Sequence, residues 1–491
     1  MIKTNFLLVG GLAVVSLTTI SRMSFSQSTT ALPNIIYIYA DDMGYGDLGC
    51  YGQKYIKTPN IDRLAERGIR FTQHYTGAPV CAPARCCLLT GKNTGRAFIR
   101  NNYELPDSSP SKSGQLPLPR NEETIAETLK KSGYTTAIIG KWGLGSIESE
   151  GNPNKQGFDF FYGYADQVHA HNHFPEFLWK NDQQVFLKNN VSTVHPTYKK
   201  DETIDSLEYK KYIGTHYSLD LMTNEAISFI KQCEEKPFFL YLALVIPHKA
   251  LQVPDENLKI YEKFDKEPYD GKRGYTPHPR PHAAYAAMIS GMDTKVGEIV
   301  DQLERLGISE NTIVMFSSDN GPAEGGGLDI RFFNSTGSLR GMKGQVYEGG
   351  IREPFIVCWP GKITPGTTTD LVSAQYDLKA TLAEIAGQNV FDTDGISFLP
   401  TLLGYPGSQK KHEYLYWEFS SGGGQYAIRM GKWKGVKRDI FRNKGGKWEL
   451  YDLDKDKREV FNIAGEHPDI VARFDQIASQ RIPSKIEEWN F

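Results

Sequence analysis

The sequence predicts an α/β protein with a large mixed, mostly parallel sheet sandwiched by helices, followed by a small C-terminal α+β domain. Short apolar segments alternate with helical patterns through the first three quarters of the chain, as in parallel sheets covered on both faces. After about Gly404 the pattern changes to closely spaced strands, which favours an antiparallel sheet. The length of 491 residues is also long for one core, so a second, smaller domain is expected.

The N-terminus is predicted to be a secretory signal peptide, residues 1–26. Lys3 precedes an apolar run from Phe6 to Leu17, and the small-residue pattern Ser24-Phe25-Ser26 follows it. The run is too short for a comfortable membrane span, and no cysteine lies near the expected cut to carry a lipid. We therefore expect an exported protein, periplasmic or secreted, without a membrane anchor.

The expected strands of the large domain, residues 27–404, are short and apolar. They are Asn34–Tyr39, Thr135–Ile139, Phe238–Val245, Thr312–Ser317 and Pro354–Cys358. The helices between them are Ile61–Arg67, Thr124–Lys131, Ser218–Glu234 and His282–Leu306. Thr58 is expected to cap the first helix, with Pro59 in its first turn, and Gly133 marks the end of the second.

The expected C-terminal domain, residues 405–491, contains three strand patterns and one helix. These are Gln425–Met430, Trp433–Lys437, Trp448–Asp452 and a helix from about Pro468 to Ser479.

Charge and cysteine content exclude some functions. The 56 basic and 58 acidic residues nearly balance, so no basic field exists to bind nucleic acid. Six cysteines are few for an exported chain of this size, which indicates a packed core instead of a disulfide framework. Cys86 and Cys87 are adjacent on an expected helix and are interpreted as core residues.

Polar groups follow four of the expected strands at the point where each ends. In open parallel sheets, ligands bind beyond the carboxyl ends of the strands, so these groups predict a site at one rim. In chain order they are Asp41 with Asp42, Lys141, His248 after Pro247, and Asp319 with Asn320. The aspartates and the asparagine present oxygen, which suits a hard cation such as Ca²⁺ or Mg²⁺.

An anion site is expected beside this cation site. Pro83 favours the first turn of a helix that starts near Cys81, and a helix N-terminus next to Arg85 attracts anions. Lys141 and Lys343 add positive charge from separate loops.

Several ordered motifs together resemble those of the type I, formylglycine-dependent sulfatases of the alkaline phosphatase superfamily. The first is Cys81-Ala82-Pro83-Ala84-Arg85 followed by Leu89-Thr90-Gly91, which is similar to the family's C-x-P-x-R…(L/M)-T-G signature. The others are Pro33-Asn34-Ile35 through Asp42, Gly140-Lys141-Trp142, Pro247-His248, Ser318 to Gly321, Leu339 to Arg352, and a C-terminal Glu449 to Asp452 with Asn462. The resemblance spans roughly residues 33–490.

The resemblance implies that Cys81 is oxidised to formylglycine by a maturation enzyme. It further implies a cation, Ca²⁺ or alternatively Mg²⁺, bound by the modified Cys81 with Asp41, Asp42, Asp319 and Asn320. One hydroxyl of the hydrated aldehyde then attacks sulfur, while the second lets the aldehyde reform as sulfate leaves.

The remaining roles implied by the resemblance concern the substrate. Arg85 would hold the formylglycine hydroxyls, Lys141 and Lys343 would grip the sulfate, and His248, when protonated, would donate to the departing oxygen.

One position departs from the family's pattern, because Gly143 stands where a histidine usually follows Gly-Lys-Trp. The run from His169 to His173 offers an imidazole from another loop, or it is a histidine-rich surface loop. Substrate contacts are expected from residues near these loops: Arg100, Asn101, His169, His171 and Asn172.

The preferred interpretation is an exported sulfatase that hydrolyses sulfate esters on carbohydrates. Two alternatives stay open at this point. One is a phosphoester or phosphonate monoester hydrolase of the same superfamily. The other is a catalytically impaired protein that binds sulfated glycans, which the missing histidine keeps under consideration.

Overall fold

The computed structural model describes residues 1–2, 32–103, 115–199, 202, 204–233, 236–264, 268–442 and 446–491. Nearly all of the predicted signal peptide lies outside these residues. Residues 32–491 form one compact unit. None of the helices in the described residues combines the length and the apolar character that a membrane span requires.

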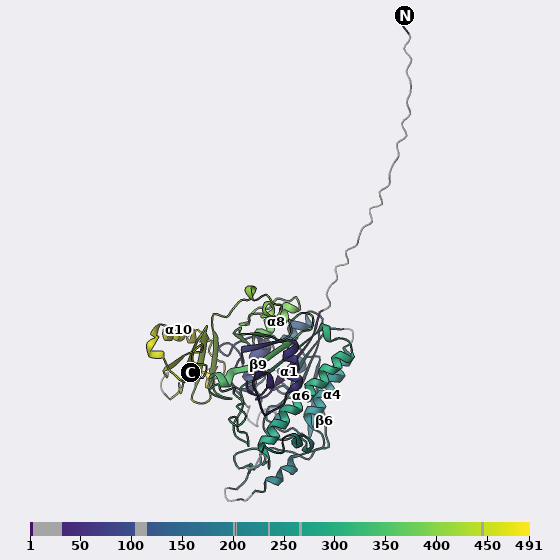
Figure 1. Ribbon diagram of the computed structural model, residues 1–491, viewed down its shortest axis with the longest axis vertical. Helices are drawn as coiled ribbons and strands as arrows, with labels where there is room; N and C mark the ends of the chain where they lie inside the picture. The colour runs from purple at the N-terminus through teal and green to yellow at the C-terminus, as the bar shows by residue number, and fades with distance from the viewer. Residues whose placement is uncertain are drawn as a thin grey trace. The chain divides into compact units, whose positions relative to one another are not determined.

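A mixed sheet forms the centre of the molecule (Figure 1). Strand β1 (Asn34–Ala40) lies in its middle and pairs in parallel with β7 (Phe238–Ala243) and β8 (Thr312–Ser318). Beyond β7 follow β3 (Thr135–Lys141) and β4 (Phe160–Tyr164), both parallel, and then the antiparallel β5 (Phe177–Lys180) and β6 (Gln183–Phe186). Beyond β8 follow β9 (Arg352–Cys358), β2 (Ile69–Tyr75), β10 (Thr367–Thr369) and β11 (Ser373–Ala374).

The predicted large, mixed and mostly parallel sheet is confirmed. Every residue of β1, β7, β8 and β9 is buried, which explains why each strand contains an apolar run, although polar residues stand at the ends of β1, β8 and β9. The strand expected at Pro354–Cys358 is antiparallel to both of its neighbours, β8 and β2. Apolar content reports burial and not strand direction, so the sequence could not show this.

Helices cover both faces of the sheet, as alternate residues of β1 show. Ile36 and Ile38 pack in one core with α1 (Pro59–Arg67), α4 (Ser218–Gln232) and α6 (Pro281–Arg305). Tyr37 and Tyr39 pack in a second core with α2 (Cys81–Thr90), α3 (Ile125–Lys130) and α8 (Asp377–Ile385). Three further helices are short: α5 (Asp255–Leu258), α7 (Glu348–Ile351) and α9 (Leu399–Leu402).

The predicted helix ends were partly right. Gly133 has a φ of +86° and its amide donates to the Lys130 carbonyl, as expected for a glycine that follows a helix. Thr58 does precede α1, but its side chain does not cap the helix. The Thr58 hydroxyl instead accepts a hydrogen bond from the Gly49 amide at 2.9 Å, so the predicted cap was wrong.

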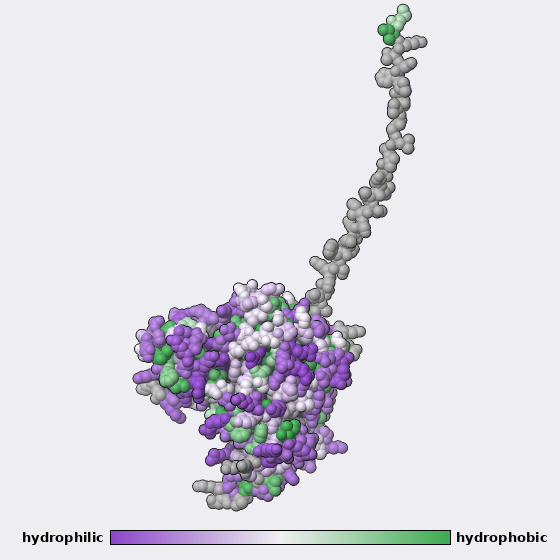
Figure 2. Space-filling model, in the orientation of Figure 1, coloured by the Kyte–Doolittle hydropathy of each residue, from purple (hydrophilic) through white to green (hydrophobic). Residues whose placement is uncertain are grey.

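A second, antiparallel sheet follows in the order β12 (Leu415–Phe419), β13 (Gln425–Met430), β14 (Trp433–Arg438) and β15 (Trp448–Asp452). Helix α10 (Pro468–Ala478) packs on it through Phe474 and Ile477. Trp417 of β12 shares a core with Tyr75 of β2, so the two sheets are packed together. The surface seen in Figure 2 is mostly hydrophilic, with scattered apolar spots.

Candidate functional site

The structure brings the strand-end groups together at one rim of the central sheet. Asp41 and Asp42 follow β1 directly, Lys141 is the last residue of β3, and His248 follows β7 after a short turn. Asp319 and its neighbour Asn320 follow β8. Parallel pairing places these ends side by side, because the Asp319 amide donates to the Ala40 carbonyl and the Asp41 amide to the Ile246 carbonyl, each at 3.0 Å.

Cys81 begins α2, with all residues of that helix buried. Its Sγ lies 3.4 Å from Asp41 Oδ1 and 3.2 Å from Lys343 Nζ. Burial, with a smaller contribution from Asp41, raises the pKa of the Cys81 thiol to about 12. The unmodified thiol is therefore neutral near pH 7 and a poor nucleophile.

Three cations surround this cysteine and its acidic neighbours. The Arg85 guanidinium lies 3.0 Å from Asp319 Oδ2 and donates to the Lys141 carbonyl at 2.8 Å. Lys141 Nζ is 2.7 Å from Asp41 Oδ2. Lys343, from the loop before α7, places Nζ 2.6 Å from an oxygen of Asp42.

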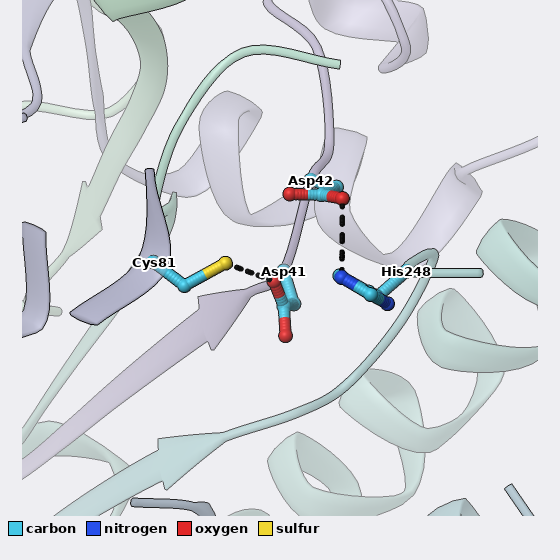
Figure 3. Close-up of side chains that lie close together, drawn as sticks. All are labelled: Asp41, Asp42, Cys81 and His248. Atoms are coloured by element: carbon cyan, nitrogen blue, oxygen red, sulfur yellow. Dashed lines mark hydrogen bonds and ion pairs between the residues drawn. The ribbon is translucent and has the colours of Figure 1, made fainter. Parts of the chain in front are cut away.

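Four side chains offer ligand atoms that all lie within 4.8 Å of one another: Asp41, Asp42, Cys81 and His248 (Figure 3). Asp42 Oδ2 is buried and has no hydrogen-bond partner among the described residues, although His248 Nε2 is 3.5 Å away. Asn320 Oδ1 is likewise buried and without a partner there, while its Nδ2 donates to Asp42 Oδ1 at 2.8 Å. Buried oxygens of this kind are costly unless a donor or a cation satisfies them, so the donor set fits a hard cation.

The surrounding charges shift the pKa values of the Asp41 and Asp319 carboxyl groups in opposite directions. Burial alone would raise the pKa of Asp41, but the charges of Lys141 and Arg85 hold the pKa well below its usual range. Burial and the charge of Asp41 raise the pKa of Asp319 to about 7, with Arg85 acting in the opposite direction. The site therefore keeps a firmly ionised carboxylate at Asp41, next to Cys81.

Four side chains stand beyond His248 and are called the outer wall here: His171, His195, Lys249 and Tyr275. The rings of His171 and His248 stack, with centroids 4.5 Å apart and planes 13° apart. His171 Nδ1 is 2.9 Å from His195 Nε2, and the Tyr275 ring packs against both of these imidazoles. The sequence pattern pointed to His171 but missed the other three, which come from loops without any periodic signal.

The other four residues that were expected to contact substrate each contact other residues of the protein. Arg100 is buried and forms an ion pair with Glu418 at 2.8 Å. Asn101 donates to the hydroxyls of Ser420 and Ser421. The ring of His169 packs against Phe177 and Tyr164, and the buried Asn172 donates to the Val191 carbonyl.

Gly143 has a φ of +74°, a conformation that favours glycine. A Cβ at this position would lie 2.8 Å from Cγ of Gln167. A side chain at position 143 would therefore be strained and would press against Gln167, whose side chain fills the adjacent space.

Known protein families and individual relatives match most of this chain. Residues 33–388 match the family model described as sulfatase, and residues 342–481 match one described as N-sulphoglucosamine sulphohydrolase, C-terminal. Human arylsulfatase A is 33% identical over 487 residues, covering 91% of this chain and 87% of that protein. The N-acetylgalactosamine-6-O-sulfatase of Bacteroides thetaiotaomicron is 31% identical, covering 91% of this chain and 92% of that protein.

Among solved structures, the protein named Ps i-CgsB superposes with a TM-score of 0.75 and 27% identity, covering 92% of this chain and 94% of its own. The same protein has been solved in complex with k-i-k-neocarrahexaose.

Proposed function

Because the chain belongs to the sulfatase family and is a sulfuric ester hydrolase, we propose that it releases sulfate from a sulfated carbohydrate through a formylglycine made from Cys81. The observation that carries this proposal is the setting of Cys81, at the start of α2 between an ionised Asp41 and the Lys343 ammonium. A thiol with a raised pKa is a poor reagent in that setting, whereas a hydrated aldehyde would present hydroxyls to the same neighbours.

The donor set supports a bound divalent cation, Ca²⁺ or Mg²⁺. Its proposed ligands are Asp41, Asp42, Asp319, Asn320 and the modified residue 81. The formylglycine hydrate supplies the nucleophilic hydroxyl, and the cation supplies charge stabilisation for the reacting oxygens.

The chain's own cations hold the anionic substrate and the modified residue. We assign Lys141 and Lys343 to the sulfate, because both ammonium groups lie beside Cys81 and its acidic neighbours. Arg85 is placed to orient the hydroxyls of residue 81, since it is fixed by Asp319 and by the Lys141 carbonyl. These preorganised charges act where negative charge develops.

His248 is assigned to the leaving-group side. Its Nδ1 lies 2.5 Å from the Lys249 carbonyl, so the ring donates there and turns Nε2 toward the cluster. Burial lowers the pKa of His248 well below its usual range, so the imidazole is neutral before substrate binds. An adjacent sulfate anion raises that pKa, which is what a role as proton donor to the departing oxygen requires.

The carbohydrate assignment draws on the relatives and on the predicted signal peptide. An exported enzyme would meet glycans outside the cell and would depend on a maturation enzyme for the change at Cys81. The phosphoester alternative is not favoured, because the relatives that match most of this chain at 31–33% identity are named as sulfatases.

Sulfate release from a panel of defined sulfated mono- and oligosaccharides tests the proposal, with the residue 81 peptide first checked by mass spectrometry. We expect release from at least one carbohydrate, and faster cleavage of aryl sulfate than of aryl phosphate. Tight glycan binding without any release from fully converted protein would instead support the impaired, glycan-binding alternative.

Removal of divalent cations tests the second part of the proposal. Chelation is expected to abolish turnover and to lower the melting temperature, because bound cation stabilises the folded state by mass action. Added Ca²⁺ or Mg²⁺ should restore both quantities, and full activity after exhaustive chelation would contradict the cation's role.

A further inference from the structure

Lys249 differs from the other cations around the site in lacking a carboxylate partner. Lys141 and Lys343 form ion pairs with Asp41 and Asp42. The Lys249 ammonium instead donates to the Glu324 backbone carbonyl at 2.6 Å, and within the described part of the chain no carboxylate lies at ion-pair distance from it. Asp42 and Glu324 attract this ammonium only from beyond ion-pair distance, and a half-buried charge that is incompletely compensated is costly. The retention of Lys249 next to His248 therefore points to an anion supplied from outside.

The side chain of Lys249 is held in place from two directions. On one side a glycine loop closes over it, since a Cβ at Gly326 would lie 2.7 Å from Lys249 Cδ. On the other side the Tyr275 ring centroid lies 5.3 Å from the ammonium. Tyr275 has a φ of +67°, a left-handed conformation that costs an aromatic residue of order 1 kcal/mol or more. The outer wall therefore contains a strained backbone position at Tyr275, and its Lys249 side chain is held in place before any ligand binds.

The outer wall leads from the reacting centre to solvent. His248 is buried, His171 stacked on it is half-buried, and His195 bonded to His171 is exposed. Imidazoles exchange hydrogen bonds with hydroxyl groups, and the face of a tyrosine ring packs well against a sugar. A leaving group that departs beside His248 would extend along this wall.

We propose that the outer wall is a subsite for a second anionic group of the carbohydrate, a sulfate or a carboxylate, on the sugar unit next to the one that carries the scissile sulfate. Lys249 pairs with that anion, while His171, His195 and Tyr275 contact the sugar. This inference rests on the proposed function and narrows its substrate class to glycans with at least two neighbouring anionic groups.

Matched substrates test the subsite. Four oligosaccharides carry the same scissile sulfate, and their neighbouring unit is neutral, sulfated, a neutral uronate methyl ester or a free uronate. Wild-type protein with verified conversion of residue 81 is expected to show a higher kcat/KM for at least one doubly anionic substrate than for its neutral counterpart. The sulfated and uronate arms distinguish the two sources of the anion.

Lys249→Met should lower kcat/KM for the preferred doubly anionic substrate by about 10-fold to 100-fold, while changing the neutral counterpart by less than about 3-fold. Lys249→Arg keeps the charge and should retain most of the preference. The matched control is Lys432→Met, which removes a lysine that also packs on an aromatic ring but lies in the turn between β13 and β14 of the second sheet. This control substitution should change kcat/KM for neither substrate.

Equal losses on both substrates, or no loss on either, would overturn the assignment. If no glycan releases sulfate, the proposed function fails separately, and the subsite is then judged by equilibrium binding to Cys81→Ala protein. Adding Lys249→Met to that protein should weaken binding of the doubly anionic oligosaccharide and leave that of the neutral one unchanged. Equal affinities for the doubly anionic ligand with and without the Lys249→Met substitution would contradict the subsite.

Discussion

At the scale of single residues, the surroundings of Cys81 suit the product of its oxidation better than the thiol. Reactive cysteines usually have a pKa lowered by nearby cations. Here Lys343 is close, but burial and the charge of Asp41 outweigh it and raise the pKa. The lysines and Arg85 are therefore better explained as binders of an anion than as activators of a thiolate.

The sequence could predict residues that directly follow a buried strand, because the pairing of the strands then fixes where these residues lie in the fold. Asp41 and Asp319 each end a buried strand, so parallel pairing alone brings them together. Lys249 and Tyr275 could not be predicted in this way, because their places depend on loop conformations such as the left-handed Tyr275. Arg100 was expected to contact substrate because it lies close to α2 in sequence. The structure gives it a buried partner, Glu418, and its contact with substrate stays a prediction.

Gly143 gives a prediction at this scale. Gly143→Ala should destabilise the protein by about 1 kcal/mol for the left-handed backbone, with an added cost from the contact with Gln167. Gly133→Ala is the matched control, because Gly133 also has a positive φ but a Cβ there would meet nothing within 4 Å. Urea unfolding should show the larger loss for Gly143→Ala, and equal losses would show that Gln167 does not restrict the position.

At the scale of elements, the register of the parallel strands aligns the site. Tyr39 of β1 pairs with Ala243 of β7 and with Ser317 of β8, so the loops after all three strands start at one level. The strands themselves were predictable because each is fully buried and apolar. The edge strand β6 and its neighbour β5 were not, since they are only four residues long and β6 has no buried residue.

The contact between α7 and the second sheet contains buried charged side chains. Lys434 of β14 lies 2.9 Å from Glu348 Oε1 and 3.5 Å from Glu459 Oε1, and all three side chains are fully buried. Lys434→Met would leave two buried carboxylates without this cation, and it should reduce the free energy of unfolding by about 3–5 kcal/mol. Chemical denaturation checks this value. Lys432→Met, just before the same strand but more exposed, should cost much less, and a similar loss for both would contradict the importance of the buried pair.

The contact between α8 and the segment just before β12 should make the free energy of unfolding depend on pH. His412 Nε2 lies 2.7 Å from Asp377 Oδ1, at the start of α8. Burial opposes the charged imidazole, but Asp377 outweighs it and raises the pKa of His412 above its usual 6.5. The folded state thus binds this proton more tightly, so the stability it adds is complete below about pH 6.5 and is lost as pH rises through the folded pKa.

His412→Gln should therefore lose more stability relative to wild type at pH 6 than at pH 9, as measured by urea unfolding across that range. A difference between the two proteins that stays constant with pH would show that the ion pair does not titrate as described.

At the scale of the whole molecule, the second sheet contributes to the site from outside by fixing the loops that carry it. Trp417 of β12 donates to the Thr76 carbonyl just before α2, and Lys434 holds α7, which follows the Lys343 loop. The alternation of strands and helices predicted the large sheet and the smaller antiparallel one. It gave no information on how the two pack, because that packing depends on individual buried contacts between distant segments.

The central claim is that residue 81, once converted, performs the reaction. Protein prepared with graded conversion, measured as the converted fraction of the residue 81 peptide by mass spectrometry, should release sulfate from its best carbohydrate substrate at a rate proportional to that fraction. The rate should reach zero for unconverted protein and for Cys81→Ala. Sulfate release by protein whose residue 81 is entirely thiol would contradict the account.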